Sequence, residues 1–342
     1  MLRSLFLSGG SAWLFVRAVT FLFVFIAASR LLPGHDRQVP GYQPHPVRML
    51  IRYGLSVAIT AALIAGCASR TVTDPPSPGI TGIVTNNLTA FDAACSCHPQ
   101  SAVRYLQWQQ TFPENSMRAV TALNAEPLIE LEPSGVSLTE ITAGRYDTWL
   151  SSIARDVAGL HSPVLMSFAP EANGNWYSWG KGRSTASAEV AAWRHVVTVF
   201  RRSGAGNAQW IWIVNQLWPG SAALPPLWPG SAYVNMTGVD GYFRIPSDTF
   251  ASVFGPTITE LRKISNRPVL ITETSARPAA GQARALAEIS AGVRRDRLAG
   301  FIWFDISKPG NGPSYGAWAL TGQALTDYSQ IARQGGLFSV AA

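Results

Sequence analysis

From residue 79 onward, the chain alternates short apolar runs with longer segments in which apolar residues recur every three to four positions. Short apolar runs bounded by Pro or Gly are typical of strands buried on both faces, whereas the longer pattern is typical of amphipathic helices. Eight such alternations in roughly 260 residues match the number of elements and the length of a (β/α)8 barrel. We therefore predict an α/β fold, a (β/α)8 TIM barrel that forms a single domain over residues 79–342.

The predicted strands cover residues 80–84, 103–108, 127–132, 164–168, 210–214, 238–241, 269–272 and 301–304. The predicted helices cover residues 88–95, 116–123, 146–160, 188–200, 250–264, 283–293 and 325–333. In a barrel of this kind the functional side chains lie at the C-terminal ends of the strands. The residues at those ends, which we expect to ring one face, are Trp108, Glu132, Glu171, Asn215, Asp240, Tyr242, Glu273, Trp303 and Asp305.

Two of the predicted strands are each followed by a glutamate. The segment PVLMSFAPEANGNWYSWG, residues 163–180, places Glu171 in a loop with aromatic and amide side chains, and RPVLITETS, residues 267–275, leads to Glu273. Glycoside hydrolysis with retention uses two carboxylates about 5 to 5.5 Å apart, one as acid/base and one as nucleophile. We therefore expect a sugar-cleaving site. The alternatives are a surface loop packed on the barrel rim for the first segment, and a carboxylate that only accepts a backbone hydrogen bond for the second.

The side chains around these glutamates are suited to sugar binding. Aromatic rings stack on the faces of sugars, and amides and carboxylates bind hydroxyl groups. We expect Trp108, Glu132, Asn173 and Asn215 to contact the substrate. The loop 217–231 contains WPGS twice, and we expect one of its two tryptophans to bind sugar, the alternative being a loop anchored to the barrel.

Several segments occur in an order that resembles glycoside hydrolase family 26, the β-mannanase family: PLIELEP, YDTWLSSIARD, PEANGNWYSWG, YVNMTGVDGYF and PVLITETS. In this clan of barrels the acid/base ends strand four and the nucleophile ends strand seven. The resemblance implies that Glu171 is the acid/base and Glu273 the nucleophile, with retention of anomeric configuration. It also implies that Tyr242 touches the nucleophile, that Trp303 is the aromatic platform under the sugar at the cleavage point, and that Trp176 helps to form the same subsite.

The leading hypothesis is therefore a retaining endo-β-glycanase that hydrolyses mannan or a related β-glucan. Pro170 stands where family mannanases usually have a histidine, which motivates a second hypothesis, a catalytically weak carbohydrate-binding pseudoenzyme. A third is a factor that trims the exopolysaccharide of its own cell. We find no metal or phosphate motif and no dinucleotide fingerprint, so we expect no cofactor, a polysaccharide partner and a monomer.

The N-terminal region has the layout of a secreted lipoprotein. Residues 49–67, MLIRYGLSVAITAALIAGC, contain a short basic start, an apolar run and small residues before a cysteine, as in a signal peptide. The ending resembles a lipobox, so we expect lipidation of Cys67, a linker over residues 68–78, and a protein anchored by lipid outside the cytoplasm. The alternative is an uncleaved membrane anchor. We interpret residues 1–48, an upstream hydrophobic leader, as an over-extended reading frame with the true start at Met49.

The net charge of +7 does not extend over the predicted barrel. Residues 1–70 contain seven arginines and one acidic residue, whereas the remaining 272 residues contain 20 basic and 19 acidic groups. Nucleic-acid binding depends largely on clustered positive charge. The nearly neutral balance of the domain therefore argues against a nucleic-acid partner.

The domain contains two cysteines, Cys95 and Cys97. A C-x-C pair rarely forms a good disulfide, and His98 alone beside it does not complete a zinc site. We therefore expect two buried or free thiols.

Overall fold

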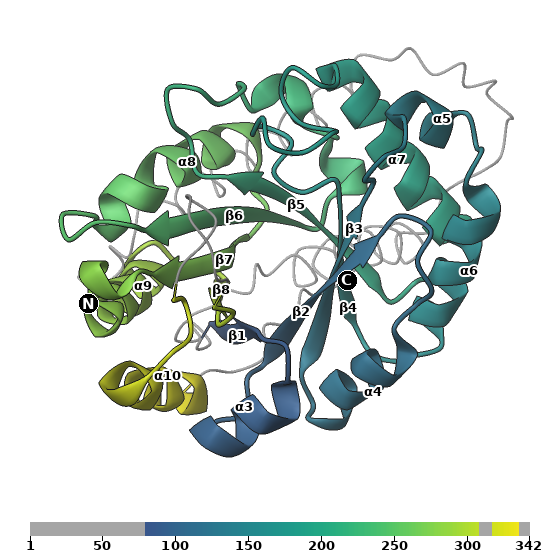
Figure 1. Ribbon diagram of the computed structural model, residues 1–342. Coiled ribbons are helices and arrows are strands. Elements are labelled where there is room, and N and C mark those ends of the chain that lie inside the picture. Colours follow the sequence, from purple (N-terminus) through teal and green to yellow (C-terminus); the bar gives the residue numbers. More distant parts are fainter. Residues whose placement is uncertain (1–78, 308–316, 335–342) are drawn as a thin grey trace, which may run out of the picture. The chain divides into compact units, whose positions relative to one another are not determined.

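Eight parallel strands form a closed barrel in the computed structural model, which describes residues 79–307 and 317–334 (Figure 1). Each strand pairs with the next, and the last pairs with the first. The strands are β1 (Ile80–Val84), β2 (Ser101–Gln107), β3 (Glu126–Glu132), β4 (Val164–Phe168), β5 (Ala208–Asn215), β6 (Met236–Phe243), β7 (Val269–Ala276) and β8 (Gly300–Phe304). This confirms the predicted (β/α)8 barrel.

Helices surround the strands on the outside (Figure 1). The α-helices are α3 (Leu88–Cys95), α4 (Glu114–Ala122), α5 (Leu138–Thr142), α6 (Asp147–Ala158), α7 (Ala186–Arg202), α8 (Phe250–Ile264), α9 (Gln282–Arg295) and α10 (Gly322–Gln334). Short 3-10 turns cover Pro225–Leu227, Ser231–Tyr233 and Pro278–Ala280. The helix α5 was not expected, because five residues are too few for a helical apolar pattern to be recognised.

Side chains along each strand alternate between two apolar layers. Those that face the barrel axis, such as Leu128, Leu165 and Leu270, form one buried cluster. Those that face outward, such as Ile129 and Met166, form a second buried cluster with the helices. Because successive residues of a strand point to opposite faces, position along the strand decides which side chains reach the site at its C-terminal end.

The strand β7 contains one extra residue relative to both of its neighbours. Asp240 of β6 is level with Glu273, whereas the preceding Val239 is level with Ile271. The pairing with β8 shifts in the same interval of β7. A bulge of this kind changes the direction of the side chains that follow it. Our sequence prediction ended this strand at residue 272 and therefore missed both the bulge and the residues beyond it.

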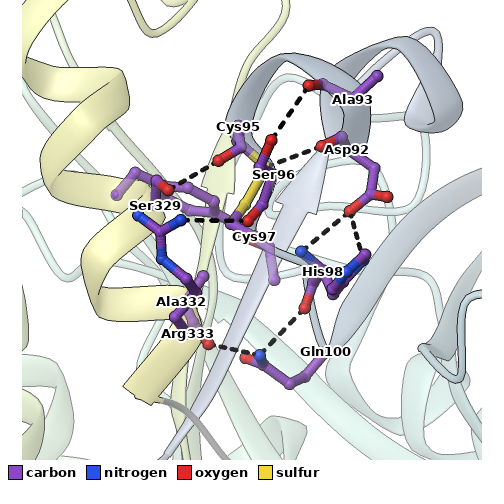
Figure 2. Close-up of a disulfide and its surroundings, with 12 residues drawn as sticks. Asp92, Ala93, Cys95, Ser96, Cys97, His98, Gln100, Ser329, Ala332 and Arg333 are labelled. Carbon is purple, nitrogen blue, oxygen red and sulfur yellow. Dashed lines mark hydrogen bonds and ion pairs between the residues drawn. A yellow bond between two sulfur atoms is a disulfide. The ribbon is translucent and has the colours of Figure 1, made fainter.

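The two cysteines of the domain form a disulfide, so the prediction of free thiols is wrong (Figure 2). The intervening Ser96 has a left-handed backbone, with φ of 48°, which turns the chain sharply at the end of α3. This turn leaves the Cα atoms of Cys95 and Cys97 5.1 Å apart, within the range that a disulfide spans. Ser329 of α10 donates a hydrogen bond to the Cys95 carbonyl at 2.7 Å. The disulfide therefore lies where α3, α10 and the approach to β2 meet.

Glu126, the first residue of β3, provides a stability test that is independent of the site. Burial raises the pKa of this carboxyl to about 7. Between its ordinary value near 4.5 and pH 7 the unfolded chain binds fewer protons than the native one, so the contribution of Glu126 to stability falls as the pH rises through this window. We expect Glu126→Gln to remove this loss. The melting temperature of the variant minus that of the wild type should increase from pH 4.5 to 7 and then level off.

The control for this experiment is Glu114→Gln, because Glu114 lies on the surface in an exposed ion pair with Arg118. A difference in melting temperature that does not change with pH would contradict the assignment of the raised pKa to Glu126.

The predicted leader, signal peptide, lipidation site at Cys67 and linker lie outside the described residues. Over residues 79–307 and 317–334, none of the helices is both long enough and apolar enough to span a bilayer.

Candidate active site

A cleft of about 680 Å³ contains both glutamates singled out from the sequence. It lies at the C-terminal ends of the strands, where a barrel of this kind carries its functional groups. Its walls combine aromatic rings, amides, the two carboxylates and one guanidinium group. The lining residues are Glu171, Trp176, Tyr177, Asn215, Gln216, Trp218, Tyr242, Arg244, Glu273, Phe304 and Trp318.

Glu171 is fixed in the cleft by its backbone and by both of its carboxylate oxygens. The residue has φ of 55°, a left-handed conformation that is unfavourable for a side chain with a Cβ. Its backbone N–H donates to the carbonyl of Ile213 on β5 at 3.1 Å. The amide of Asn215 donates to Oε1, and the indole N–H of Trp176 donates to Oε2 at 2.8 Å. Two neighbouring elements therefore hold this carboxylate at one position.

Glu273 receives a hydrogen bond from a residue that the sequence analysis missed. The hydroxyl of Tyr105 on β2 donates to Oε2 of Glu273 at 2.6 Å. Burial, and then the negative charge of Glu273, raises the pKa of Tyr105, so this side chain remains a phenol that can donate. The alternation along β2, in which Val103 faces the axis, was the available signal, because it places Tyr105 on the same side.

Two further acidic side chains lie buried in the barrel beneath the cleft. Burial, and then the charge of Glu273, raises the pKa of Glu130 on β3. Burial, and then the charges of Glu171 and Glu273, raises the pKa of Asp240 on β6, although the Thr272 hydroxyl donates to it at 2.6 Å. Both shifts favour the protonated form of the deeper acids. The two deeper acids therefore add less negative charge to the site than two ionised carboxylates would.

Two stacked tryptophans form one side of the cleft. The rings of Trp176 and Trp218 have centroids 5.2 Å apart and planes 27° apart, and Trp176 is 48% exposed. A Cβ on Gly174 would lie 2.4 Å from the Trp176 ring, so glycine is required for this approach. Of the two tryptophans in the WPGS repeats, Trp218 lies in the cleft, whereas Trp228 packs edge-on against Trp212 in the core with centroids 5.1 Å apart.

Residues 139–299, which include both glutamates of the cleft, match the sequence model of glycosyl hydrolase family 26. The barrel is similar to this family over that range. Over 197 residues the chain is 30% identical to Endoglucanase H of Acetivibrio thermocellus. This similarity covers 53% of the chain but only 22% of that relative, so the chain spans a small part of its length.

Solved structures share the fold of this barrel at low sequence identity. The catalytic domain of an endo-β-1,4-mannanase from Bacillus sp. JAMB-750 has a TM-score of 0.58 and 17% identity, over 74% of this chain and 85% of that one. A double mutant of an endo-β-1,4-mannanase from Cellulomonas fimi has a TM-score of 0.56 and 15% identity, over 74% of this chain and 70% of that one. The β-mannanase BoMan26A from Bacteroides ovatus has a TM-score of 0.55 and 12% identity, over 75% of this chain and 88% of that one.

The structure contradicts the expected placement of Trp303. This side chain is fully buried in the outer layer between the strands and the helices, so it cannot lie under a sugar. On β8 the side chains that face the axis are Ile302 and Phe304, and alternation therefore turns Trp303 outward. The ring that lines the cleft here is Trp318, whose backbone carbonyl accepts from the Trp303 indole at 3.4 Å.

Two other residues predicted to contact sugar are also buried away from the cleft, so these predictions are wrong. Asn173 is fully buried, and both ends of its amide bond the backbone of Asn215 at 2.8 Å, so it holds the loop after β4 onto β5. Trp108 lies in the core against Trp149 and Phe168. Pattern alone could not separate these positions from the cleft, because each lies just beyond a strand end.

The remaining predicted contacts lie nearer to the site. Asn215, Trp176 and Tyr242 line the cleft. Glu132 is 8% exposed and accepts a hydrogen bond from the Gln107 amide, and its contact with substrate stays a prediction. Over the described part of the chain, no three His, Cys, Asp or Glu side chains are grouped so that they could hold a metal ion.

Proposed function

We propose that the protein is a retaining endo-β-glycanase that hydrolyses a β-linked polysaccharide by double displacement. The observation that carries the proposal is the meeting of Glu171 and Glu273 in one aromatic cleft at the ends of β4 and β7. Two carboxylates that flank a sugar-binding cleft are the usual machinery of glycoside hydrolysis.

In the first step Glu171 gives its proton to the glycosidic oxygen while an oxygen of Glu273 attacks the anomeric carbon. The bond between that carbon and the leaving sugar breaks, and a covalent glycosyl-enzyme forms. Tyr105 orients Glu273 through its hydrogen bond. In the second step Glu171 takes a proton from water, the water oxygen attacks the same carbon, and Glu273 is released with the original configuration restored.

The polar and aromatic neighbours serve positioning and binding. Asn215 and Trp176 hold the Glu171 carboxylate beside the position that the glycosidic oxygen would occupy. The rings of Trp176 and Trp218 offer stacking faces for sugars, and the nearly buried Trp318 lines the same cleft. Because the relatives are named an endoglucanase and endo-β-1,4-mannanases, mannans and β-glucans are the first polymers to test.

The experiment is sugar release by the purified protein from soluble β-mannans, β-glucans and β-xylans, with Glu171→Ala alongside. We expect release from at least one polymer by the wild type, and none by the variant, which lacks the acid. On a dinitrophenyl glycoside, whose leaving group needs no proton, Glu171→Ala should give a rapid burst of dinitrophenol as the glycosyl-enzyme accumulates. Binding of polymers without release by the wild type would instead support a carbohydrate-binding protein.

We further propose that the protein works outside the cytoplasm, attached by a lipid on Cys67. The disulfide between Cys95 and Cys97 supports this location, because disulfides persist in oxidising compartments. Cys67→Ala should move the protein from the membrane fraction to the soluble fraction of the native cell. Equal membrane association of the two forms would contradict lipid attachment.

A further inference from the structure

Two arginines begin at neighbouring strand ends on one side of the cleft. Arg244 directly follows β6 and lines the cleft, and Arg277 directly follows β7. The backbone N–H of Arg277 donates to the carbonyl of Phe243 at 3.0 Å. The two side chains therefore leave adjacent strands at the same level of the barrel.

Both guanidinium groups lie over aromatic rings of the cleft wall. The Cζ atom of Arg244 is 5.7 Å from the centroid of the Tyr242 ring, and that of Arg277 is 5.6 Å from the Trp318 ring. The two rings are themselves in contact, with centroids 5.2 Å apart. A cation over the face of an aromatic ring is attracted to it, and a planar guanidinium group matches the geometry of carboxylates and sulfates.

Charges of both signs act on Arg244 on this side of the cleft. Burial, and then the positive charge of Arg277, lowers the pKa of Arg244, while the charges of Glu171 and Asp248 act in the opposite direction. An oxygen of Asp248 accepts from the backbone N–H groups of Arg244 and Ile245, at 2.6 and 3.0 Å. An anion close to both guanidinium groups would reduce their mutual repulsion. Each has five N–H donors, so it can bind such an anion while keeping its contacts within the protein.

We propose that Arg244 and Arg277 form a subsite for an anionic substituent of the polysaccharide, a carboxylate or a sulfate ester, so that the preferred substrate is an acidic β-glycan. The proposal rests on the proposed function, since it names the substrate class of the same cleft. A sugar stacked on Tyr242 would present a substituent at its edge to the Arg244 guanidinium group over that ring, and this group lies close enough to Arg277 to feel its charge. Bidentate binding of a carboxylate or sulfate by arginine is both strong and directional.

The test compares polymers with the same backbone and different substituents. Hydrolysis and binding are measured for carboxymethyl, sulfated and hydroxyethyl cellulose, and for the same three derivatives of a β-mannan. We expect the ratio of kcat/KM for a charged form to kcat/KM for the neutral hydroxyethyl form to be about tenfold or more. The ratio should fall as the salt concentration is raised from 50 to 500 mM, because mobile ions screen the attraction. The carboxymethyl and sulfated arms distinguish the two kinds of anion.

Variants connect the preference to the two arginines. Arg244→Gln and Arg277→Gln should each lower the ratio toward one, and Arg277→Lys, which keeps the charge but not the planar group, should lower it less. Arg118→Gln is the control, because Arg118 lies exposed on α4 in an ion pair with Glu114, and it should leave the ratio unchanged. Melting temperatures identify any variant that fails to fold, and the salt dependence of the wild type requires no variant.

Each outcome separates this inference from the proposed function. Hydrolysis of the neutral polymers with no preference for charged ones, or a preference that survives both glutamine variants, overturns the anionic subsite and leaves the glycanase proposal intact. Binding of charged polymers without hydrolysis of any polymer supports the subsite and contradicts the glycanase. A protein that neither binds nor hydrolyses any of the six polymers overturns both.

Discussion

Glu273→Ala is expected to lower kcat on the preferred polymer by roughly four orders of magnitude or more, as removal of a covalent nucleophile does in other hydrolases. The substitution removes the oxygen that would attack the anomeric carbon and leaves Tyr105 without its acceptor. Because Glu273 is only partly buried, alanine leaves a space that opens to the cleft, so the fold should persist. Rates of sugar release by the variant and the wild type, at matched melting temperature, measure the effect.

A small external nucleophile provides the sharper form of this experiment. Azide should enter the space left by the carboxylate and attack the anomeric carbon of a dinitrophenyl β-glycoside, which yields an α-glycosyl azide. Glu114→Ala, on the exposed surface of α4, is the control and should match the wild type. A Glu273→Ala protein that keeps more than about 1% of the activity would remove Glu273 from the nucleophile role.

Gly300→Ala is expected to prevent folding or to lower stability by about 3 kcal/mol or more, the largest structural effect we anticipate for a single added methyl group. Gly300 begins β8 and pairs with Ile80 of β1, where the barrel closes. A Cβ on this residue would lie 2.0 Å from the carbonyl oxygen of Ile80, and the φ of 145° is one that alanine rarely adopts. The variant must therefore separate the first strand from the last. Soluble yield and the denaturation midpoint measure the effect.

The matched control for Gly300 is Gly206→Ala. A Cβ on Gly206 would meet no atom within 4 Å, and its φ lies outside the left-handed region. We expect this variant to differ little from the wild type. If Gly300→Ala were equally well tolerated, the close approach of β8 to β1 would not be a constraint on the fold.

The order of elements could be predicted because periodicity along the chain reports burial directly. The strands β1 and β4 and the helix α8 have the expected boundaries, since each apolar run is bounded by Pro, Gly or a capping residue. The two glutamates could also be identified, because each follows a run of buried residues. In a closed parallel barrel, all such positions face the same end.

The face of a strand to which a side chain points could not be predicted as well as the position of the residue along the strand. The apolar run of residues 301–304 does not reveal that Trp303 faces outward, whereas Trp318, which lies outside the strands, lines the cleft. Tyr105 was missed because its partner, Glu273, is 168 residues away. The disulfide depends on the left-handed backbone of one residue, Ser96, and a serine gives little indication of that conformation.

The position of Glu273 in the cleft depends on the one extra residue in β7. Thr272, one residue earlier, lies deeper and bonds Asp240, while Thr274, one residue later, is fully buried beside the outward-facing Trp303. A glutamate at either neighbouring position would therefore miss the cleft although the composition of the segment would be the same. A barrel with evenly paired strands at this point would turn the carboxylate away from the cleft.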